Sequence, residues 1–287
     1  MSNISHIVQP GETLGRIAKK FGVRVQDIMA LNPTIEDEDL IFAGQEILIP
    51  TGAPNSEQPT QPTQPTPPST AGSPLNGLDA SERITSIATC IKDKGFAFAI
   101  RYYNIENSDL LPTKRLILSE AQALVRAGLQ LGAIFQQNGR VISSFSREKG
   151  LRDGAMAHSR AVNDIGQPAG STIYFGVDFD ASPSEVGNEI TDYFKAVSEA
   201  LANANGGSPR YAIGVYGSGL VCSEMLAANL LTFTWLSQST GHAGSKEFAE
   251  QKRYNLIQFL DRDVCGVNLD PDETNPDKPS GFFTIPV

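Results

Sequence analysis

The chain has 287 residues and a formal net charge of -9, because 32 acidic side chains outnumber 23 basic ones. This length suits one large domain or two ordinary ones and is enough to bury a hydrophobic core. Lys and Arg form no basic stripe, which argues against nucleic-acid binding. No apolar run reaches the roughly 18 residues of a membrane span, and residues 1–9 lack the basic and apolar regions of a secretory signal peptide.

Residues 1–50 predict a small module with the order strand, helix, helix, strand. A short strand is expected at residues 6–9, followed by a turn and a helix that Thr13 caps. Gly22 ends this helix, and a second helix is expected over residues 25–31. A closing strand is expected at residues 46–49. The apolar side chains of both helices and of the closing strand predict a separate small core.

Residues 51–77 predict a linker. They contain seven prolines, no aromatic residue and a single charged side chain, Glu57, so they cannot build a packed core. The triplet Gln-Pro-Thr occurs three times between residues 58 and 66, and such a tract favours an extended, semi-rigid spacer. The sequence therefore predicts three parts: a module at 1–50, a linker at 51–77 and a larger domain at 78–287.

In the larger domain, apolar strand patterns alternate with helical patterns. Eight strands are expected near residues 77–79, 96–103, 129–136, 172–180, 211–216, 232–237, 255–260 and 264–270. Residues 182–185 (Ser-Pro-Ser-Glu) predict a capping box at the start of one of the intervening helices. This repeated alternation predicts an α/β fold with a TIM-like (β/α)8 barrel, and a doubly wound open sheet is the alternative.

The expected strands end in acidic residues. Asp79 ends the first strand, Asp178 and Asp180 the fourth, and Asp270 the eighth. Side chains alternate along a strand, so Asp178 and Asp180 are expected to share a face with Gly176, which would leave room for a ligand. Because the carboxyl ends of barrel strands carry the chemistry of this fold, these four carboxylates are the candidate catalytic residues.

Aromatic and polar side chains follow other strands. Aromatic rings stack on sugar faces, and amide or guanidinium groups read hydroxyl groups, so this set is typical of a sugar-binding site. The candidate substrate-binding residues are Arg101, Tyr103, Tyr216, Trp235 and Gln258.

The N-terminal module resembles a LysM domain from end to end. The resemblance rests on residues 6–14 (His-Ile-Val-Gln-Pro-Gly-Glu-Thr-Leu), 31–33 (Leu-Asn-Pro) and 44–50 (Gly-Gln-Glu-Ile-Leu-Ile-Pro). It implies binding of an N-acetylglucosamine-containing glycan, chiefly peptidoglycan or chitin, in a shallow groove. The matching groove positions are Gly11, Glu12, Thr13 and Leu14 on one side and Ile41 and Phe42 on the other. For Leu14, packing in the core is an equal alternative.

The larger domain is similar to family-25 glycoside hydrolase lysozymes, and more closely to a glycoside-hydrolase-like domain of unknown function described in mycobacterial proteins. The resemblance rests on residues 77–81, 173–180 and 214–216, with Trp235 and Gln258. The lysozyme pattern implies a glutamate as general acid where this chain has Asp180, and an aspartate where it has Asn268. If Asp180 is the acid, Asp178 is expected to stabilise the oxocarbenium charge, with Asp79 and Asp270 tuning the site.

Two functions follow from these patterns. The first is a peptidoglycan-targeted glycoside hydrolase, in which the LysM module anchors the chain to the wall and the linker lets the barrel reach nearby glycan. The alternative is a non-catalytic protein of wall binding or of cell-wall or injection-system assembly, with a degenerate barrel. No cofactor is expected. No metal site is expected either, since the acidic loop at residues 270–277 lacks the glycine of a calcium-binding EF-hand.

The sequence also supports expectations about cysteines and location. Cys90, Cys222 and Cys265 are too few for a disulfide framework and are expected to be core thiols. Without a recognisable signal peptide, the protein is expected to reach the bacterial cell wall by a non-classical route, through a secretion or phage-like delivery machinery, and otherwise to be cytoplasmic.

Overall fold

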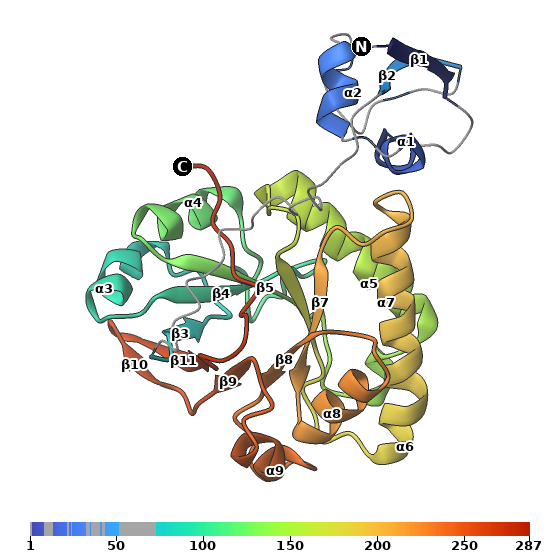
Figure 1. Ribbon diagram of the computed structural model, residues 1–287. Coiled ribbons are helices and arrows are strands. Elements are labelled where there is room, and N and C mark those ends of the chain that lie inside the picture. Colours follow the sequence, from blue (N-terminus) through green and yellow to red (C-terminus); the bar gives the residue numbers. More distant parts are fainter. Residues whose placement is uncertain are drawn as a thin grey trace. The chain divides into compact units, whose positions relative to one another are not determined.

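The structure is a computed structural model that describes residues 2–8, 14–21, 23, 25–32, 35, 41, 44–51 and 73–287. The chain divides into two compact units, Met1–Pro68 and Ser69–Val287 (Figure 1). Residues 52–72 of the expected linker lie outside the described residues. Among the described helices, none is long and apolar enough to cross a membrane.

In the N-terminal unit, strand β1 (Ser2–Ile7) pairs antiparallel with β2 (Glu46–Thr51). Helices α1 (Leu14–Phe21) and α2 (Val25–Leu31) come between them in the sequence, which confirms the predicted order. The first strand begins earlier than expected and ends at Ile7. The amide of Asn32 donates to the Leu48 carbonyl oxygen at 2.7 Å and accepts from the Leu48 N–H at 2.9 Å, so it ties the end of α2 to β2.

The larger unit is a closed eight-stranded barrel, formed by β3–β9 and β11. Its strands, with the short β10, are β3 (Asn76–Asp79), β4 (Phe98–Tyr102), β5 (Gln130–Phe135), β6 (Thr172–Gly176), β7 (Ala212–Gly217), β8 (Phe233–Leu236), β9 (Leu256–Gln258), β10 (Arg262–Val264) and β11 (Val267–Thr274). The closure confirms the predicted barrel and excludes the open sheet, because β11 pairs with both β3 and β9.

Helices cover the outside of the barrel (Figure 1). They are α3 (Ala88–Asp93), α4 (Leu118–Arg126), α5 (Arg147–Ser159), α6 (Pro183–Glu185), α7 (Thr191–Asn203), α8 (Gly219–Ala227) and α9 (Ser245–Glu250). Short 3-10 turns span Thr85–Ile87 and Ile142–Ser144, and π-helical segments span Arg160–Ile165 and Val186–Ile190. The capping box is confirmed: the Ser182 hydroxyl accepts from the Glu185 N–H, and Glu185 accepts from the Ser182 N–H.

Alternation along the strands separates two apolar layers. Phe98, Ile100, Tyr174, Tyr216 and Trp235 belong to the layer that fills the barrel interior. The other layer lies between the strands and the helices, and it includes the side chains next to these in sequence, such as Ala99, Phe175 and Val215. Because a strand has a period of two, one residue of register decides which layer a side chain joins.

The last strand differs from the predicted repeat, because β11 runs antiparallel to its neighbours and no helix precedes it. A parallel crossover needs a dozen or more residues, but β10 and β11 are joined by a tight turn at Cys265 and Gly266. Both residues have positive φ, 60° and 80°, as a two-residue hairpin turn of type I′ requires. The N-terminal end of β11 therefore lies beside the carboxyl ends of the parallel strands.

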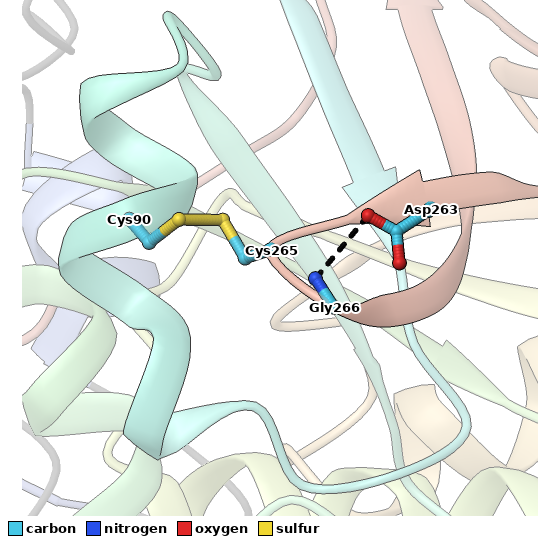
Figure 2. The surroundings of a disulfide bond; sticks show 4 residues. All are labelled: Cys90, Asp263, Cys265 and Gly266. Carbon is cyan, nitrogen blue, oxygen red and sulfur yellow. Dashed lines mark hydrogen bonds between the residues drawn. A yellow bond between two sulfur atoms is a disulfide. The ribbon is translucent and has the colours of Figure 1, made fainter.

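Cys90 and Cys265 form a disulfide, which corrects the expectation of three free thiols. Cys90 lies on α3 and Cys265 in the turn of the β10–β11 hairpin, 175 residues later in the chain (Figure 2). Spacing offered no signal for this pair because only the barrel closure brings the two residues to a Cα–Cα distance of 6.2 Å. Cys222 is a buried free thiol, as predicted.

We expect reduction of this disulfide to lower the free energy of unfolding of the barrel by about 2–4 kcal/mol, because it closes a long loop in the unfolded chain. Thermal unfolding with and without dithiothreitol measures this difference. A Cys90→Ser/Cys265→Ser variant is expected to unfold at the lower temperature and to be insensitive to the reductant. Equal melting temperatures for oxidised and reduced wild-type protein would contradict the bond's stabilising role.

Candidate active site

Two of the predicted carboxylates lie on neighbouring strands at the carboxyl end of the barrel. Asp79 on β3 is the register partner of Asp270 on β11. Asp79 is 1 % exposed, and its oxygens accept from the Tyr102 hydroxyl at 3.0 Å and from Nε2 of Gln258 at 2.6 Å. Asp270 is only half-buried. Asp79 is therefore the inner carboxyl of this pair, and Asp270 is the one that a substrate can touch.

Both carboxyl groups hold protons more tightly than usual. Burial, assisted by the negative charge of Asp270, raises the pKa of Asp79 from its ordinary 3.8 to about 7. Burial and the charges of Asp261 and Asp178 also raise the pKa of Asp270. Closely spaced carboxylates disfavour one another's ionisation, so this end of the barrel retains protons in mildly acidic solution.

This shift predicts how the stability of the barrel varies with pH. Between pH 4 and 7 the folded state keeps the Asp79 proton that the unfolded chain releases, so the free energy of unfolding falls as pH rises through this window. We expect Asp79→Asn to flatten this slope, with the remainder coming from Asp270 and Asp272. Denaturant unfolding at pH 4.5, 6 and 7.5 measures the slope, and an unchanged slope in the variant would contradict the assignment.

A third carboxyl, Asp272, is buried deeper in the barrel, where it binds Trp235. This contact corrects the prediction that Trp235 binds substrate. The Trp235 side chain is fully buried and donates its Nε1–H to Oδ1 of Asp272 at 2.8 Å, so it belongs to the core and offers no face to a sugar. Oδ2 of Asp272 has no partner among the described residues, and burial together with the Asp79 charge raises its pKa well above 3.8. The sequence could have indicated Asp272, because it lies two residues after Asp270 and side chains two residues apart on a strand share a face.

Tyr216 and Gln258 connect these groups, and the structure places both at the predicted site. The Tyr216 hydroxyl donates to Oε1 of Gln258 at 2.9 Å, while the amide nitrogen of Gln258 donates to Asp79. Burial and the charges of Asp178, Asp79, Asp272 and Asp270 raise the pKa of Tyr216. Since Tyr216 and Gln258 are 8 % and 5 % exposed, their main role is to position the Asp79 carboxyl group, which Gln258 contacts directly.

Asp178 is a further accessible carboxyl, with a side chain 30 % exposed. Its Oδ2 accepts from Nε of Arg140 at 3.2 Å and from Nε2 of Gln136 at 3.3 Å. Gln136 also fills the space above Gly176, where an added Cβ would lie 3.0 Å from its side chain. This corrects the expectation that Gly176 leaves room for a ligand: it makes room for the side chain that orients Asp178.

Asp180 does not share the partners of Asp178, and because β6 ends at Gly176, strand alternation does not extend over residues 178–180. The Asp180 side chain is exposed, and its Oδ1 accepts from the backbone N–H of Ala243 at 2.8 Å. It is thus tied to the loop between β8 and α9.

Two predicted substrate-binding residues, Arg101 and Tyr103, face the helices and are corrected here. β4 turns Phe98, Ile100 and Tyr102 inward, so the prediction missed the inward face by one residue. Arg101 is fully buried and pairs with Glu120 on α4, with an Nε–Oε1 distance of 3.1 Å. The buried Tyr103 hydroxyl donates to Gln167 at 2.9 Å. Tyr102, which holds Asp79, is the strand's contribution to the site.

Lys114 is a site residue that the sequence patterns did not indicate. Its loop returns to β4, where the Leu116 N–H donates to the Tyr102 carbonyl oxygen at 2.9 Å. This return places Nζ of Lys114 4.4 Å from the centre of the Tyr102 ring and 3.2 Å from the Gln136 carbonyl oxygen. Because Lys114 follows the end of β4 by twelve residues, no strand-end rule could identify it.

A cavity of about 220 Å³ adjoins this cluster. Gln136 and Gly176 line it on the barrel side, and Asp153 and Tyr193 on the helix side. The cavity does not reach the four carboxylates Asp79, Asp178, Asp270 and Asp272, so Gln136 is the residue shared by the two places.

The predicted LysM groove is described only in part, because Gly11, Glu12, Thr13 and Phe42 lie outside the described residues. Leu14 is fully buried in the small core with Ile17 and Ile28, which corrects its assignment as a side-chain contact to glycan. Ile41 is partly buried and packs against the same core.

The comparisons with known proteins agree with this architecture. Residues 89–272 match the family model described as the Rv2525c-like, glycoside hydrolase-like domain, and residues 6–50 match the LysM domain. The uncharacterized protein YbfG of Bacillus subtilis is 32 % identical over 61 % of this chain but only 24 % of its own length. SpoIVD-associated factor A of the same species is 42 % identical over 19 % of this chain and 14 % of its own.

Among solved structures, the Tat-secreted protein Rv2525c of Mycobacterium tuberculosis has a TM-score of 0.60 and 22 % identity, and covers 73 % of this chain and 98 % of its own. That likeness concerns the fold. The part of this chain that matches YbfG covers about a quarter of the length of YbfG. On the match over residues 89–272, it belongs to the Rv2525c-like, glycoside hydrolase-like family, with a LysM domain at its N-terminal end.

Proposed function

We propose that this protein is a lysozyme-like glycoside hydrolase that its LysM domain targets to peptidoglycan. The observation that carries the proposal is the pair of accessible carboxyl groups, Asp178 and Asp270, at the polar mouth of the barrel. Their surroundings differ: Asp178 accepts from a guanidinium and an amide, whereas burial and like charges raise the pKa of Asp270. Glycoside hydrolysis requires two carboxyl groups, one that gives a proton and one that stabilises the developing positive charge, and different surroundings favour this division of roles.

In the proposed reaction, Asp270 gives its proton to the glycosidic oxygen as the bond between that oxygen and the anomeric carbon breaks. The bonding electron pair stays on the leaving oxygen, and the Asp178 carboxylate stabilises the positive charge that develops on the sugar. Water then adds to the anomeric carbon, and its proton returns to Asp270. Gln136 and Arg140 hold Asp178 in place, and Asp79 lies beside Asp270 as its register partner.

The proposal is tested by incubating the full-length protein with purified peptidoglycan sacculi between pH 4 and 8. Mass spectrometry of the soluble fraction is expected to show muropeptides with new reducing ends. Because the proposed acid must be protonated, release is expected to decline as pH rises. Binding to the sacculi without release at any pH would contradict the hydrolytic function.

A second candidate, a non-catalytic glycan-binding or wall-assembly protein, is favoured by one observation. The position of the lysozyme general acid is occupied by Asp180, which is exposed and bound to the Ala243 N–H. The same sacculus experiment separates the two candidates. Action at the cell wall, and delivery there by a secretion or phage-like machinery, belong to the proposal, and immunoblots of wall and cytosol fractions test them.

A further inference from the structure

Lys114 is a half-buried ammonium group beside the proposed catalytic carboxyl groups. Its Nζ donates to the Gln136 carbonyl oxygen and lies over the Tyr102 ring, whose hydroxyl in turn holds Asp79. Burial and the nearby Arg140 lower the pKa of Lys114 to about 8, so the group is still largely protonated at neutral pH.

No ion pair of Lys114 occurs within the described part of the chain. The negative charges of Asp178 and Asp79 act on Lys114, but Asp178 is paired with Arg140, and Asp79 accepts from Tyr102 and Gln258. An ammonium group has three donors, and the structure gives Lys114 one hydrogen-bond acceptor and one aromatic face. It therefore retains capacity for a further anionic partner, although leaving a partly buried cation unpaired costs stability.

The charges at the barrel mouth are distributed unevenly. Lys114 and Arg140 come from the loops that follow β4 and β5, whereas Asp261 and Asp270 come from the segment that leads from β9 into β11. Arg140 is already paired and its side chain is 77 % exposed. Within the described residues, Lys114 is therefore a cation at the mouth that has no carboxylate partner and can meet a bound substrate.

We propose that Lys114 is a specificity-determining residue that binds a carboxylate carried by the glycan. The lactyl ether that distinguishes muramic acid from glucosamine ends in a free carboxylate wherever no stem peptide is attached to it, whereas chitin carries no such group. A charge-assisted hydrogen bond to this carboxylate selects glycan strands that carry no stem peptide over neutral N-acetylglucosamine polymers. The inference rests on the proposed function, since it concerns the substrate of the same site.

The first test uses the wild-type, full-length protein and two disaccharide probes with the same number of rings. One is N-acetylglucosaminyl-N-acetylmuramic acid, which carries the carboxylate, and the other is chitobiose. Lysines are acetylated with acetic anhydride at pH 8, and peptide mass spectrometry measures each site separately, so binding at the LysM domain does not interfere. We expect the acidic probe, but not chitobiose, to slow acetylation of Lys114 several-fold, with Lys195 on α7 as the internal reference.

The second test compares affinities of full-length variants by calorimetry. Lys114→Gln is expected to lose about tenfold or more of the affinity for the acidic disaccharide and nothing for chitobiose. Lys114→Arg is expected to retain the preference, and Lys195→Gln to match wild type. The LysM contribution is common to all variants and cancels.

Equal protection of Lys114 by both probes would overturn the carboxylate assignment while leaving glycan binding at the barrel intact. Protection by neither probe would overturn the assignment and count against the proposed site itself. Loss of affinity for chitobiose in Lys114→Gln would mean that the residue shapes the site rather than reads the carboxylate.

Discussion

Asp270→Asn is expected to reduce muropeptide release from sacculi by about 10²–10⁴-fold, the usual contribution of a general acid. The amide cannot deliver the proton that the glycosidic oxygen needs, while its similar size preserves the register of β11 beside β3. Asp178→Asn is expected to cost about 10²–10³-fold, because it removes the charge that faces the developing cation. Initial rates of reducing-end formation at pH 5 measure both effects.

The controls use neighbouring carboxylates. Asp263→Asn removes an exposed charge from the same hairpin, where Asp263 accepts from the Gly266 N–H, and is expected to keep wild-type activity (Figure 2). Asp180→Asn separates the structural assignment from the one that the lysozyme pattern implies. If Asp180→Asn abolishes release and Asp270→Asn does not, the general acid is Asp180 and the proposed mechanism is wrong.

Arg101→Met is expected to destabilise the barrel by about 3–5 kcal/mol, because it leaves the Glu120 carboxylate buried without its counter-charge. Both side chains are fully buried, and Arg101 also donates to the Thr113 carbonyl oxygen at 2.9 Å and to that of Ala80. Its loss would therefore loosen α4, the loop after β3 and the loop that carries Lys114. Chemical denaturation at pH 7 measures the change.

The double variant Arg101→Met/Glu120→Leu provides the matched control. Since it removes both charges, we expect it to be more stable than Arg101→Met alone. If Arg101→Met is as stable as wild type, Glu120 must be protonated or paired with another group in the variant. Reduced glycan binding in a fully stable Arg101→Met protein would support the original assignment of Arg101 to the substrate.

The sequence by itself determined the barrel and the small module before it. Periodicity indicated all eight barrel strands, although the last, expected at residues 264–270, lies at Val267–Thr274, and the expected range crosses the β10–β11 turn. The Ser182–Glu185 capping box formed as predicted, because it depends on residues close together in the chain. Asp270 joins the site for another reason than the prediction gave, because antiparallel β11 places it, within the strand, beside the end of β3. The acidic ends of parallel strands indicated Asp79 and Asp178, and Tyr216 and Gln258 also lie among them. Local pattern is sufficient here because the carboxyl ends of barrel strands converge in any such fold.

Tertiary structure alone decided which of these side chains are accessible and how they are paired. The register of β4 turned Tyr102 into the barrel in place of the predicted Arg101. Because β6 ends at Gly176, Asp178 and Asp180 have different partners. The antiparallel closure by β11 buried Asp272 against Trp235 and brought Cys265 to Cys90. The loop after β4 folds back to that strand and places Lys114 over the Tyr102 ring. These features depend on register, strand length and contacts between distant segments, and no local sequence period encodes them.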